Sequence, residues 1–367
     1  MPPSSALLIG GTGPTGPHLK RGLQQRGFDV TLMHTGRHEL DEVADVPHLH
    51  CDVRSADAIA TALGAATFDV AVVTYGRLRE IARVLRGRVG KFISIGGVPA
   101  YRGYFDGALF TPPGLPVPTR EDATTSSEAE DGKSYRIRRT EEIVFELHPS
   151  ATHFRYPFVH GPRQLAPREW CVVRRILDER PFIVIPDDGL TLVTFGFTEN
   201  LAHAVLLPLD HPEPALGQIF NAGDDECLTI RQIVELLTDE FEHQWDIVNM
   251  PADLALPARP LMMASRTTHR VTGTDKLREL LGYRDVVGAR DAVRTTGRWL
   301  AEHRPVAGGL EERVLQDPFD YPAEDALVAS WRAAKTRVEV PEWTTAPGYG
   351  LSYAGPGTSY RRADTRI

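Results

Sequence analysis

The chain has 367 residues, of which 42% are hydrophobic and 25% are charged, and its formal net charge at pH 7 is −8. This composition is typical of a globular protein with a sizeable core, and the acidic balance excludes the basic footprint of a nucleic-acid-binding protein. No apolar run reaches membrane-spanning length, and the first residues lack the pattern of a signal peptide. The three cysteines, Cys51, Cys171 and Cys227, are far apart and have no metal-ligand spacing. We therefore expect reduced thiols, no metal site and no membrane or nucleic-acid partner, in a cytoplasmic protein.

Strand and helix patterns alternate through the first half of the chain. Short runs rich in apolar and β-branched residues predict strands over 6–9, 28–33, 49–53, 69–73 and 91–95. Helices are predicted over 56–63, with Ser55 as the N-cap, and over 77–85. This alternation predicts βαβ units around a parallel sheet, and hence an α/β fold with a Rossmann-like, doubly wound sheet.

The second half is less regular. Residues 102–133 are rich in Gly, Pro, Thr and acidic residues and are predicted to form a long loop, which in compact domains is usually functional or mobile. A helix is predicted over 134–147, and strands over 152–159 and 218–221.

These elements divide the chain into three parts. A dinucleotide-binding domain is predicted for 1–164, completed by about 196–222. A smaller substrate-binding lobe is predicted for 165–195 and 223–302, and an extra C-terminal tail for 303–367.

A glycine-rich turn follows the first predicted strand. Gly10 permits a tight turn, Gly13 lets the backbone approach a pyrophosphate, and Gly16 lets the following helix pack close to the strand. The start of that helix offers free N–H groups and positive dipole charge to phosphates. The turn therefore predicts a bound dinucleotide, contacted by Gly10, Thr12, Gly13, Pro14, Thr15 and Gly16.

Several segments occur in a characteristic order along the chain. They are the glycine turn, Asp52-Val53, 115–122 (LPVPTRED), 155–164 (RYPFVHGPRQ), 220–225 (FNAGDD) and 275–283 (DKLRELLGY). In this order they resemble the extended short-chain dehydrogenases/reductases of the NAD-dependent epimerase/dehydratase type, over residues 6 to about 300. The resemblance implies a cofactor site that also includes Asp52, Val53, Thr74, Tyr75, Gly76, Tyr135, Arg139, Pro157 and Val159.

The end of the second predicted strand bears on the choice of cofactor. NAD-binding sites of this kind place a carboxylate there, where it binds the ribose 2′-hydroxyl. Here the position is held by His34, with Arg37 close behind it, and no carboxylate occurs before Glu39. A guanidinium binds a 2′-phosphate in a fork, so the sequence favours NADP, with NAD as the alternative. The other interpretation of Arg37 is a solvated loop residue.

By the resemblance, catalysis would use a Tyr-x-x-x-Lys pair on a helix, in which tyrosinate takes the substrate's hydroxyl proton while hydride moves to or from the nicotinamide. The matching residues are Tyr135 and, in the Lys position, Arg139; residues four apart share one helix face. Arg139 keeps the positive charge that favours tyrosinate, although its donors are arranged differently. The alternative interpretation of Tyr135 is a surface tyrosine in a basic segment.

The hydroxyl that the family places after the fifth strand is missing. By the spacing Gly97 occupies this position, and Ser94 lies further back in the strand. Other sources of a hydroxyl are Thr111, Thr124 and Thr125. Other candidate acids or bases are Tyr101, Tyr104 and His160.

The substrate is expected between the carboxyl edge of the sheet and the smaller lobe, in contact with Gly97 and Arg163. Arg174 and Arg175 offer either a site for a diphosphate or carboxylate or ordinary surface ion pairs.

Two functions follow. The first is an NAD(P)-dependent oxidoreductase or epimerase/dehydratase acting on a small hydroxyl or carbonyl substrate, such as a nucleotide-linked sugar or another small metabolite. The second is a catalytically degenerate dinucleotide-binding protein that acts as a sensor, scaffold or partner subunit. The glycine turn and the cleft-building segments favour the enzyme. The resemblance also implies a homodimer, paired through the helices over 77–87 and 134–147.

Overall fold

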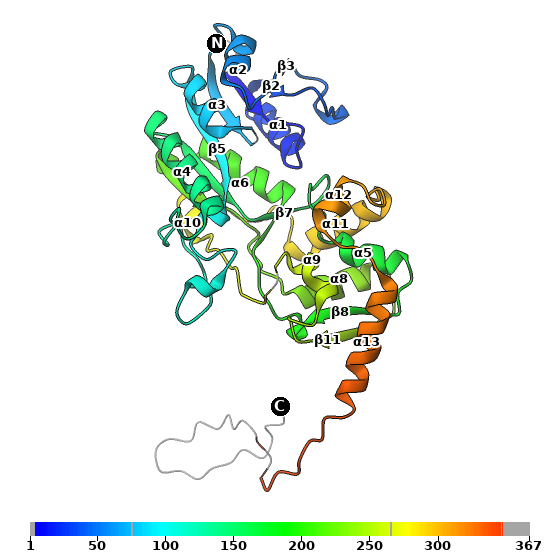
Figure 1. Ribbon diagram of the computed structural model, residues 1–367. Helices are drawn as coiled ribbons and strands as arrows, with labels where there is room; N and C mark the ends of the chain where they lie inside the picture. Colours follow the sequence, from blue (N-terminus) through cyan, green and yellow to red (C-terminus); the bar gives the residue numbers. More distant parts are fainter. Residues whose placement is uncertain (1–3, 75, 265, 346, 348–367) are drawn as a thin grey trace. The chain divides into compact units, whose positions relative to one another are not determined.

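The computed structural model describes residues 4–345, except 75 and 265, together with residue 347 (Figure 1). The chain forms two compact units, Met1–Phe319 and Asp320–Ile367. The described part of the second unit is helix α13 (Tyr321–Lys335) with the extended residues after it. The Asp320 side chain caps α13 by accepting a hydrogen bond from the Ala323 amide at 3.2 Å.

The first unit is organised around one parallel sheet of seven strands. Their spatial order is β10 (Gln218–Asn221), β6 (Thr152–Tyr156), β5 (Val89–Gly97), β4 (Phe68–Val73), β1 (Ser4–Ile9), β2 (Phe28–His34) and β3 (His48–His50). Every neighbouring pair is parallel. The strand order reverses between β1 and β4, and in open α/β sheets ligands bind at this switch point. The predicted doubly wound sheet is confirmed.

Helices cover both faces of this sheet (Figure 1). Leu7 and Ile9 of β1 pack in a core with α2 (Ala56–Leu63), α3 (Leu78–Leu85) and α4 (Gly132–Leu147). Ala6 and Leu8 alternate to the other face, which is covered by α1 (Gly16–Gln25), α6 (Thr198–Asp210), α7 (Pro212–Ala215) and α10 (Asp275–Leu281). Both faces are therefore buried, which explains why the strands read as continuous apolar runs.

A smaller lobe is formed by segments that lie between β6 and β10 and after β10 in the chain. Its elements are α5 (Trp170–Leu177), β8 (Phe182–Pro186), α8 (Ile230–Glu240), β11 (Asp246–Met250), α9 (Arg259–Met262), α11 (Ala289–Glu302) and α12 (Leu310–Leu315). Strands β8 and β11 pair in parallel, and α11 packs against α5 and α8. The segment 275–283, expected in this lobe, instead packs on the main sheet through Leu277, Leu281 and Tyr283.

The lobe also includes residues 303–319, which were expected in the C-terminal tail. Glu312 of α12 accepts hydrogen bonds from Trp170 Nε1 at 3.0 Å and Arg174 Nη1 at 2.6 Å. Asp317 pairs with Arg175 at 2.7 Å, and both side chains are buried. These ion pairs tie the segment to α5.

Two predicted strands differ in the structure. Strand β3 ends at His50, so Asp52 and Val53 lie in the turn before α2. The strand expected over 152–159 is broken at Pro157, because proline has no amide hydrogen to donate to a sheet. After this break, β7 (Phe158–His160) pairs with β9 (Phe195–Phe197) in a separate two-stranded sheet.

Candidate active site

The glycine turn has the geometry expected of a pyrophosphate cradle. Gly10 has a φ of 89°, a conformation that glycine adopts readily. A Cβ on Gly16 would lie 1.9 Å from the carbonyl oxygen of Gly11, so only glycine fits where α1 begins. A Cβ on Gly13 would instead meet no atom nearer than the Gly10 oxygen at 3.5 Å, which leaves space above the turn. Thr15 is the N-cap of α1 and is buried.

The end of β4 holds the turn in place. The Thr74 hydroxyl donates to the carbonyl oxygens of Ile9 and Gly10, at 3.0 and 3.2 Å. Gly76 has a φ of 103°, and a Cβ there would lie 2.8 Å from the oxygen of Val53. These contacts bring the residues expected at the cofactor to one edge of the sheet. Tyr75 lies outside the described residues.

A polar pocket of about 410 Å³ lies where β2 and β3 end. It is lined by Thr35, Arg37, His50, Cys51, Asp52 and Arg54. Arg37 and Asp52, separated by 14 residues in the chain, thus line the same pocket. His34 does not line it: its ring is buried, and Nδ1 accepts a hydrogen bond from the Gly36 amide at 3.2 Å.

A second pocket, of about 190 Å³, adjoins the glycine turn. Its lining joins Pro14 of the turn to Val159 and His160 of β7, with Phe195 of β9. The break at Pro157 therefore carries Val159, one of the residues expected at the cofactor, to a place beside the turn. The lining also includes Gln164, Leu165, Ala166, Arg168, Glu169, Phe158 and Met263.

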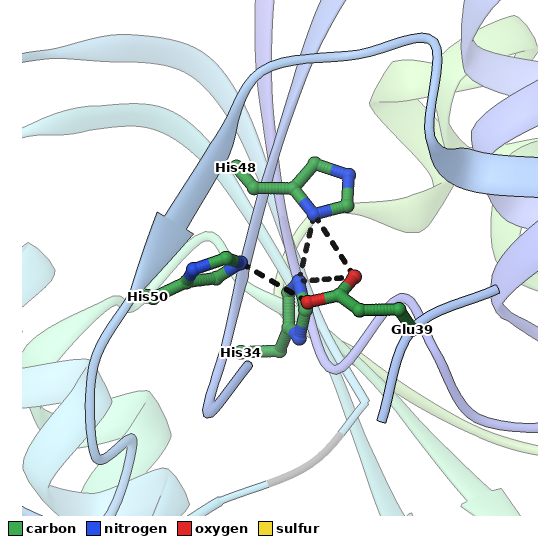
Figure 2. Close-up of side chains that lie close together, drawn as sticks. All are labelled: His34, Glu39, His48 and His50. Atoms are coloured by element: carbon green, nitrogen blue, oxygen red, sulfur yellow. Dashed lines mark hydrogen bonds and ion pairs between the residues drawn. The ribbon is translucent and has the colours of Figure 1, made fainter. Parts of the chain in front are cut away.

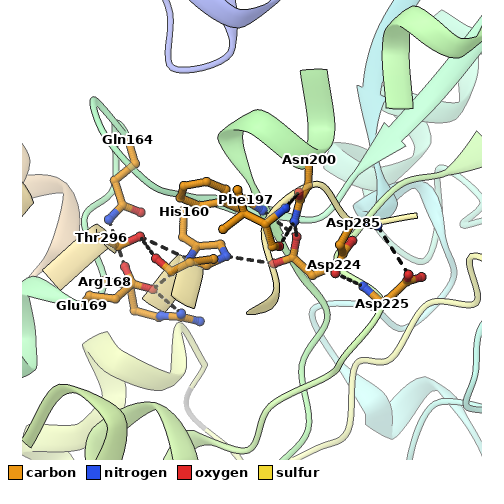
Figure 3. A network of polar contacts seen from close by, with 12 residues as sticks. His160, Gln164, Arg168, Glu169, Phe197, Asn200, Asp224, Asp225, Asp285 and Thr296 are labelled. Atoms are coloured by element: carbon orange, nitrogen blue, oxygen red, sulfur yellow. Dashed lines mark hydrogen bonds and ion pairs between the residues drawn. The ribbon is translucent and has the colours of Figure 1, made fainter. Parts of the chain in front are cut away.

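A buried polar network lies behind this pocket (Figure 3). His160 Nε2 and Asp224 Oδ2 are 2.9 Å apart, and both side chains are buried. The other oxygen of Asp224 accepts from the Phe197 amide and from Asn200 Nδ2, each at 2.9 Å. His160 is thus held in position by Asp224, with its second nitrogen 3.5 Å from Thr296 Oγ1.

The guanidinium group of Arg168 has hydrogen-bond donors that no atom of the described residues accepts. Its Nη2 pairs with Glu169, and its plane lies over the Phe195 ring, 3.4 Å from the centroid. Nε and Nη1 are buried and have no hydrogen-bond partner, and neither has Oε1 of Gln164 nearby. Burial alone would raise the pKa of Glu169, but the charges of Arg168 and His160 and the hydrogen bond from Gln164 together outweigh it and lower this pKa. Buried hydrogen-bond donors without a partner are uncommon in folded proteins. Donors of a guanidinium group in a pocket lining are suited to bind an anionic ligand.

Arg270 adds a second buried cation near Arg168. Burial lowers the pKa of Arg270, and the charge of Arg168 lowers it further. Its Nη2 donates to the Met262 oxygen at 2.7 Å, while Nε has no partner. Arg270 lines a third pocket, of about 480 Å³, which shares Met263 with the pocket beside the turn. The two arginines therefore give this side of the molecule positive charge at adjoining cavities.

Tyr135 and Arg139 lie on α4 but not in the lining of these pockets. Arg139 Nη1 pairs with Glu142 at 2.8 Å and with Glu146 at 3.3 Å, and its side chain is 41% exposed. The positive charge of Arg139 is therefore paired with two carboxylates of the same helix. The Tyr135 ring has the guanidinium of Arg138 5.7 Å from its centroid.

The other hydroxyl candidates are mostly committed elsewhere. Ser94 is fully buried, with Oγ 2.8 Å from His153 Nδ1. Tyr101 donates to Asn221 Oδ1 at 2.7 Å, and burial raises its pKa to about 12. Burial likewise raises the pKa of Tyr104 to about 12. Both tyrosines are therefore protonated near neutral pH and serve as donors rather than bases.

The arginines expected at the substrate have partners in the protein. Arg163, which has a φ of 63°, pairs with Glu42 and lines none of the described pockets. Arg174 and Arg175 form ion pairs with residues of the 303–319 segment, but the pair of Arg175 with Asp317 is buried and is not the surface pair that was the alternative. Gly97 ends β5, and a Cβ there would lie 3.0 Å from Pro99.

The residues that sequence reasoning missed are Arg168, Arg270 and Asp224. Arg168 lies just after the motif segment 155–164, and Asp224 lies within the segment 220–225, but neither was given a role there. Their proximity depends on the β7–β9 pairing, which no local pattern shows. Within the described part of the chain, no helix is long and apolar enough to cross a lipid bilayer.

Comparisons with known proteins agree with this architecture. No protein-family model matches the chain. It is 33% identical over 87 residues to UDP-D-apiose/UDP-D-xylose synthase 2 of Arabidopsis thaliana, which covers 23% of this chain and 22% of the synthase. It is 24% identical over 186 residues to the uncharacterized protein YbjS of Escherichia coli (strain K12), covering 45% of this chain and 55% of that protein. The chain thus matches about a fifth of the first relative's length and about half of the second's.

Solved structures match over most of the chain. UDP-glucose 4-epimerase of Thermotoga maritima, solved with UDP-glucose, has a TM-score of 0.64 and 17% identity, over 82% of this chain and 100% of that one. The Bordetella bronchiseptica enzyme WbmG, solved with NAD, has a TM-score of 0.63 and 16% identity, over 82% and 94%. UDP-glucuronic acid 4-epimerase of Bacillus cereus, solved with UDP-glucuronic acid and NAD, has a TM-score of 0.61 and 15% identity, over 82% and 99%. The fold that the resemblance implies is therefore confirmed: the chain shares the architecture of these solved enzymes.

Proposed function

We propose that this protein is a dinucleotide-dependent oxidoreductase or epimerase/dehydratase whose small hydroxyl or carbonyl substrate carries an anionic group. The observation that carries the proposal is the pocket that joins Pro14 of the glycine turn to Val159 and to Arg168. A dinucleotide bound on the turn would place its reactive end toward β7, beside the unpaired donors of Arg168. A nucleotide-linked sugar fits this requirement because its diphosphate is an anion, and such sugars are bound by the epimerases of similar fold.

We propose NADP rather than NAD as the cofactor. The pocket at the end of β2 contains two guanidinium groups, from Arg37 and Arg54, and one carboxylate, from Asp52. A 2′-phosphate suits this positive excess, and a guanidinium binds its oxygens in a fork. The structures of similar fold solved with NAD make NAD the competing choice.

The proposed chemistry is hydride transfer coupled to proton transfer. When bound, the nicotinamide would supply or accept the hydride. Tyr135 would exchange the hydroxyl proton of the substrate: oxidation breaks the carbinol C–H bond and passes the O–H proton to the Tyr135 oxygen, and reduction reverses both. Arg139 would stabilise the tyrosinate by its charge, which requires the side chain to leave Glu142 and Glu146.

The first experiment is a titration of the full chain with NADPH, NADH, NADP and NAD, by calorimetry and nicotinamide fluorescence. The proposal predicts saturable binding of one equivalent, tightest for NADPH. Failure of all four ligands to bind would overturn it.

Catalysis is tested next, with carbonyl substrates, nucleotide-linked ketosugars among them, and NADPH oxidation as the readout. Tyr135→Phe should lower kcat by about 10²-fold or more, because proton transfer contributes about that much to the rate. Tyr321, in the second unit, provides a control, and Tyr321→Phe should keep full activity.

A second function competes with the first: dinucleotide binding without chemistry, in a sensor, scaffold or partner subunit. It is favoured by the pairing of Arg139 with Glu142 and Glu146 and by the burial of Ser94 against His153. The two functions differ in one result. NADPH binding with no turnover, and with Tyr135→Phe indistinguishable from the wild type, would support the binding protein.

We also propose a homodimer formed through α3 and α4, which pack side by side. Sedimentation equilibrium would test it. Ile137 of α4 is half-buried in the single chain, and Ile137→Asp should convert a dimer to a monomer if its outer edge meets the partner. A monomeric wild type would exclude this arrangement.

A further inference from the structure

Four side chains with nitrogen and oxygen ligand atoms converge where β2 gives way to the loop before β3 (Figure 2). His34 ends β2, His48 and His50 lie on β3, and Glu39 comes from the connecting loop. In the parallel pairing His34 is opposite His50, and Leu32 is opposite His48. Alternate residues of a strand share one face, so His48 and His50 point to the same side as His34.

The distances between the ligand atoms match a single small cation. His34 Nε2 lies 3.0 Å from His48 Nδ1 and 3.7 Å from Glu39 Oε2. Glu39 Oε2 also lies 3.4 Å from His48 Nδ1, and the other oxygen, Oε1, lies 3.2 Å from His50 Nε2. Zinc binds nitrogen and oxygen at roughly 2.0–2.1 Å, so the corners of its tetrahedron are roughly 3.4 Å apart. With one ligand atom taken from each residue, all four atoms lie within 4.8 Å of one another, so small movements of the side chains bring them to this spacing.

We propose that His34, Glu39, His48 and His50 form a binding site for a divalent transition metal of the zinc class. Three imidazoles and one carboxylate are ligands that zinc accepts in tetrahedral geometry. Magnesium and calcium require mostly oxygen ligands and are not suited to three nitrogens. The site is distinct from the turn that binds the pyrophosphate, and it does not depend on the proposed enzyme activity.

The neighbouring hydrogen bonds prepare two of the rings in different ways. His48 Nε2 lies 2.9 Å from the Val43 carbonyl oxygen, so this nitrogen carries the proton and Nδ1 is available as a ligand. Without metal, Nδ1 of His34 accepts from the Gly36 amide, and its Nε2 proton lies between His34 and His48. Coordination through His34 Nε2 moves the ring proton to Nδ1 and gives up the Gly36 bond. The loss of one hydrogen bond is small compared with the free energy of a structural zinc site.

The site would join both ends of a long connection. Its ligands lie at the start of the 34–48 segment, within it, and just beyond it on β3, so one ion would restrain the whole segment. Arg37 lies between His34 and Glu39, and His50 lines the same pocket as Arg37. Any effect of the metal on dinucleotide affinity rests on the proposed function, whereas metal binding itself does not.

The test uses the full chain without a polyhistidine tag, because such a tag binds zinc itself. After treatment with a chelator, the protein is titrated with Zn²⁺ in competition with a chromophoric chelator, and separately with Co²⁺ to record the visible spectrum. The proposal predicts one equivalent of Zn²⁺, a spectrum characteristic of tetrahedral Co²⁺, and no response to Mg²⁺. It does not require any dinucleotide to bind.

Three variants locate the site. His48→Gln and His50→Gln should each weaken Zn²⁺ binding by more than about tenfold, since even removing a group that only supports a ligand costs that much. His50 is 53% exposed, so His50→Gln should keep the fold, which thermal unfolding without metal would verify. His38→Gln is the matched control, because His38 is exposed in the same loop and is not part of the cluster; it should bind like the wild type.

The proposal is overturned if the wild type takes up less than one equivalent of Zn²⁺. It is also overturned if His50→Gln binds with wild-type affinity. In either case the cluster is a set of hydrogen bonds between strands. Protection of the 34–48 segment from proteolysis by Zn²⁺, lost in His50→Gln and kept in His38→Gln, would support the restraining role.

Discussion

Arg155 of β6 and Glu141 of α4 form a buried, bidentate ion pair, in which Nε and Nη2 donate to the two carboxylate oxygens at 2.9 and 2.7 Å. Burial alone would raise the pKa of Glu141, but the hydrogen bonds and charges of Arg155 and His153 together outweigh it and lower this pKa to about 2. The pair fastens the helix that carries Tyr135 to the central sheet.

We expect Glu141→Gln to destabilise the protein by about 3–5 kcal/mol, because it leaves the buried Arg155 without its counter-charge. Urea denaturation measures the change. Glu142→Gln, on the exposed side of the same helix, should change the free energy of unfolding by about 1 kcal/mol or less. Equal effects of the two substitutions would contradict the assignment. Because the native pKa of Glu141 is below its unfolded value, its stabilisation is complete above pH 4.5 and declines as the pH falls toward 2.

We expect Gly16→Ala to weaken dinucleotide binding and to lower stability by about 1–3 kcal/mol, because the added Cβ would lie 1.9 Å from the Gly11 oxygen and would push α1 off the turn. The control is Gly288→Ala, where a Cβ meets nothing within 4 Å and φ is −60°. Calorimetric titration with NADPH and thermal unfolding give the two readouts. A Gly16→Ala protein that binds NADPH like Gly288→Ala would show that the turn does not form the phosphate site.

We expect Arg37→Ala to raise the Kd for NADPH by about tenfold to a hundredfold, since a hydrogen bond to a charged group contributes about 1.5–3 kcal/mol. The Kd for NADH should change less than twofold, because NADH has no 2′-phosphate. Fluorescence titration with both nucleotides is the measurement, and NADH serves as its own control. Equal losses for both would place Arg37 elsewhere than at the 2′-phosphate.

We expect Arg168→Lys to weaken binding of a nucleoside diphosphate, measured with UDP by calorimetry, by about tenfold or more. Lysine keeps the charge opposite Glu169 but loses the planar fork that stacks on Phe195. Arg266→Lys is the control, because Arg266 is exposed in the lining of the neighbouring pocket. If UDP binds the wild type and Arg168→Lys equally, the unpaired donors of Arg168 do not serve the substrate.

A pH effect is expected at Asp285, whose pKa is raised to about 6 by burial and then by the charge of Asp224. The native state therefore holds this proton more tightly than the unfolded state, so the contribution of Asp285 to stability falls as the pH rises from about 4 to 6. Asp285→Asn removes this dependence, and the variant should gain about 1 kcal/mol on the wild type between pH 4.5 and 7.5, after allowing for solvent exposure. Unfolding curves at the two pH values measure it. A constant difference between the two proteins would contradict the raised pKa.

The parallel, doubly wound sheet could be predicted because the signals of its strands and helices are local. The glycine turn, the β-branched runs and the Ser55 cap each depend on residues within one element, and Ser55 accepts from the Ala58 amide as expected. The end of β3 was missed because Leu49, Cys51 and Val53 alternate with polar residues as in a strand, whereas the pairing with β2 stops at His50. Strand register decides that boundary, and register is a property of two segments.

The site was harder to predict for the same reason. Arg168 is an ordinary charged residue in the sequence, and its unpaired donors appear only when β7 pairs with β9 and brings Phe195 beneath it. The histidines at 34, 48 and 50 looked unrelated until the parallel register set two of them opposite each other. A His-x-His pattern on a strand that follows a strand ending in His is the signal that would have found them.

The Thr74 hydroxyl bonds the carbonyl oxygens of both Ile9 and Gly10 and so fixes the start of the glycine turn. If this turn is the proposed pyrophosphate site, it needs little ordering when the ligand binds. Ligand association should then proceed with a small loss of conformational entropy, and the binding rate should be set by encounter rather than by rearrangement of the loop. Thr74→Val keeps nearly the same side-chain shape but removes both hydrogen bonds. The loop would then lose conformational entropy when a ligand binds, and binding would be weaker.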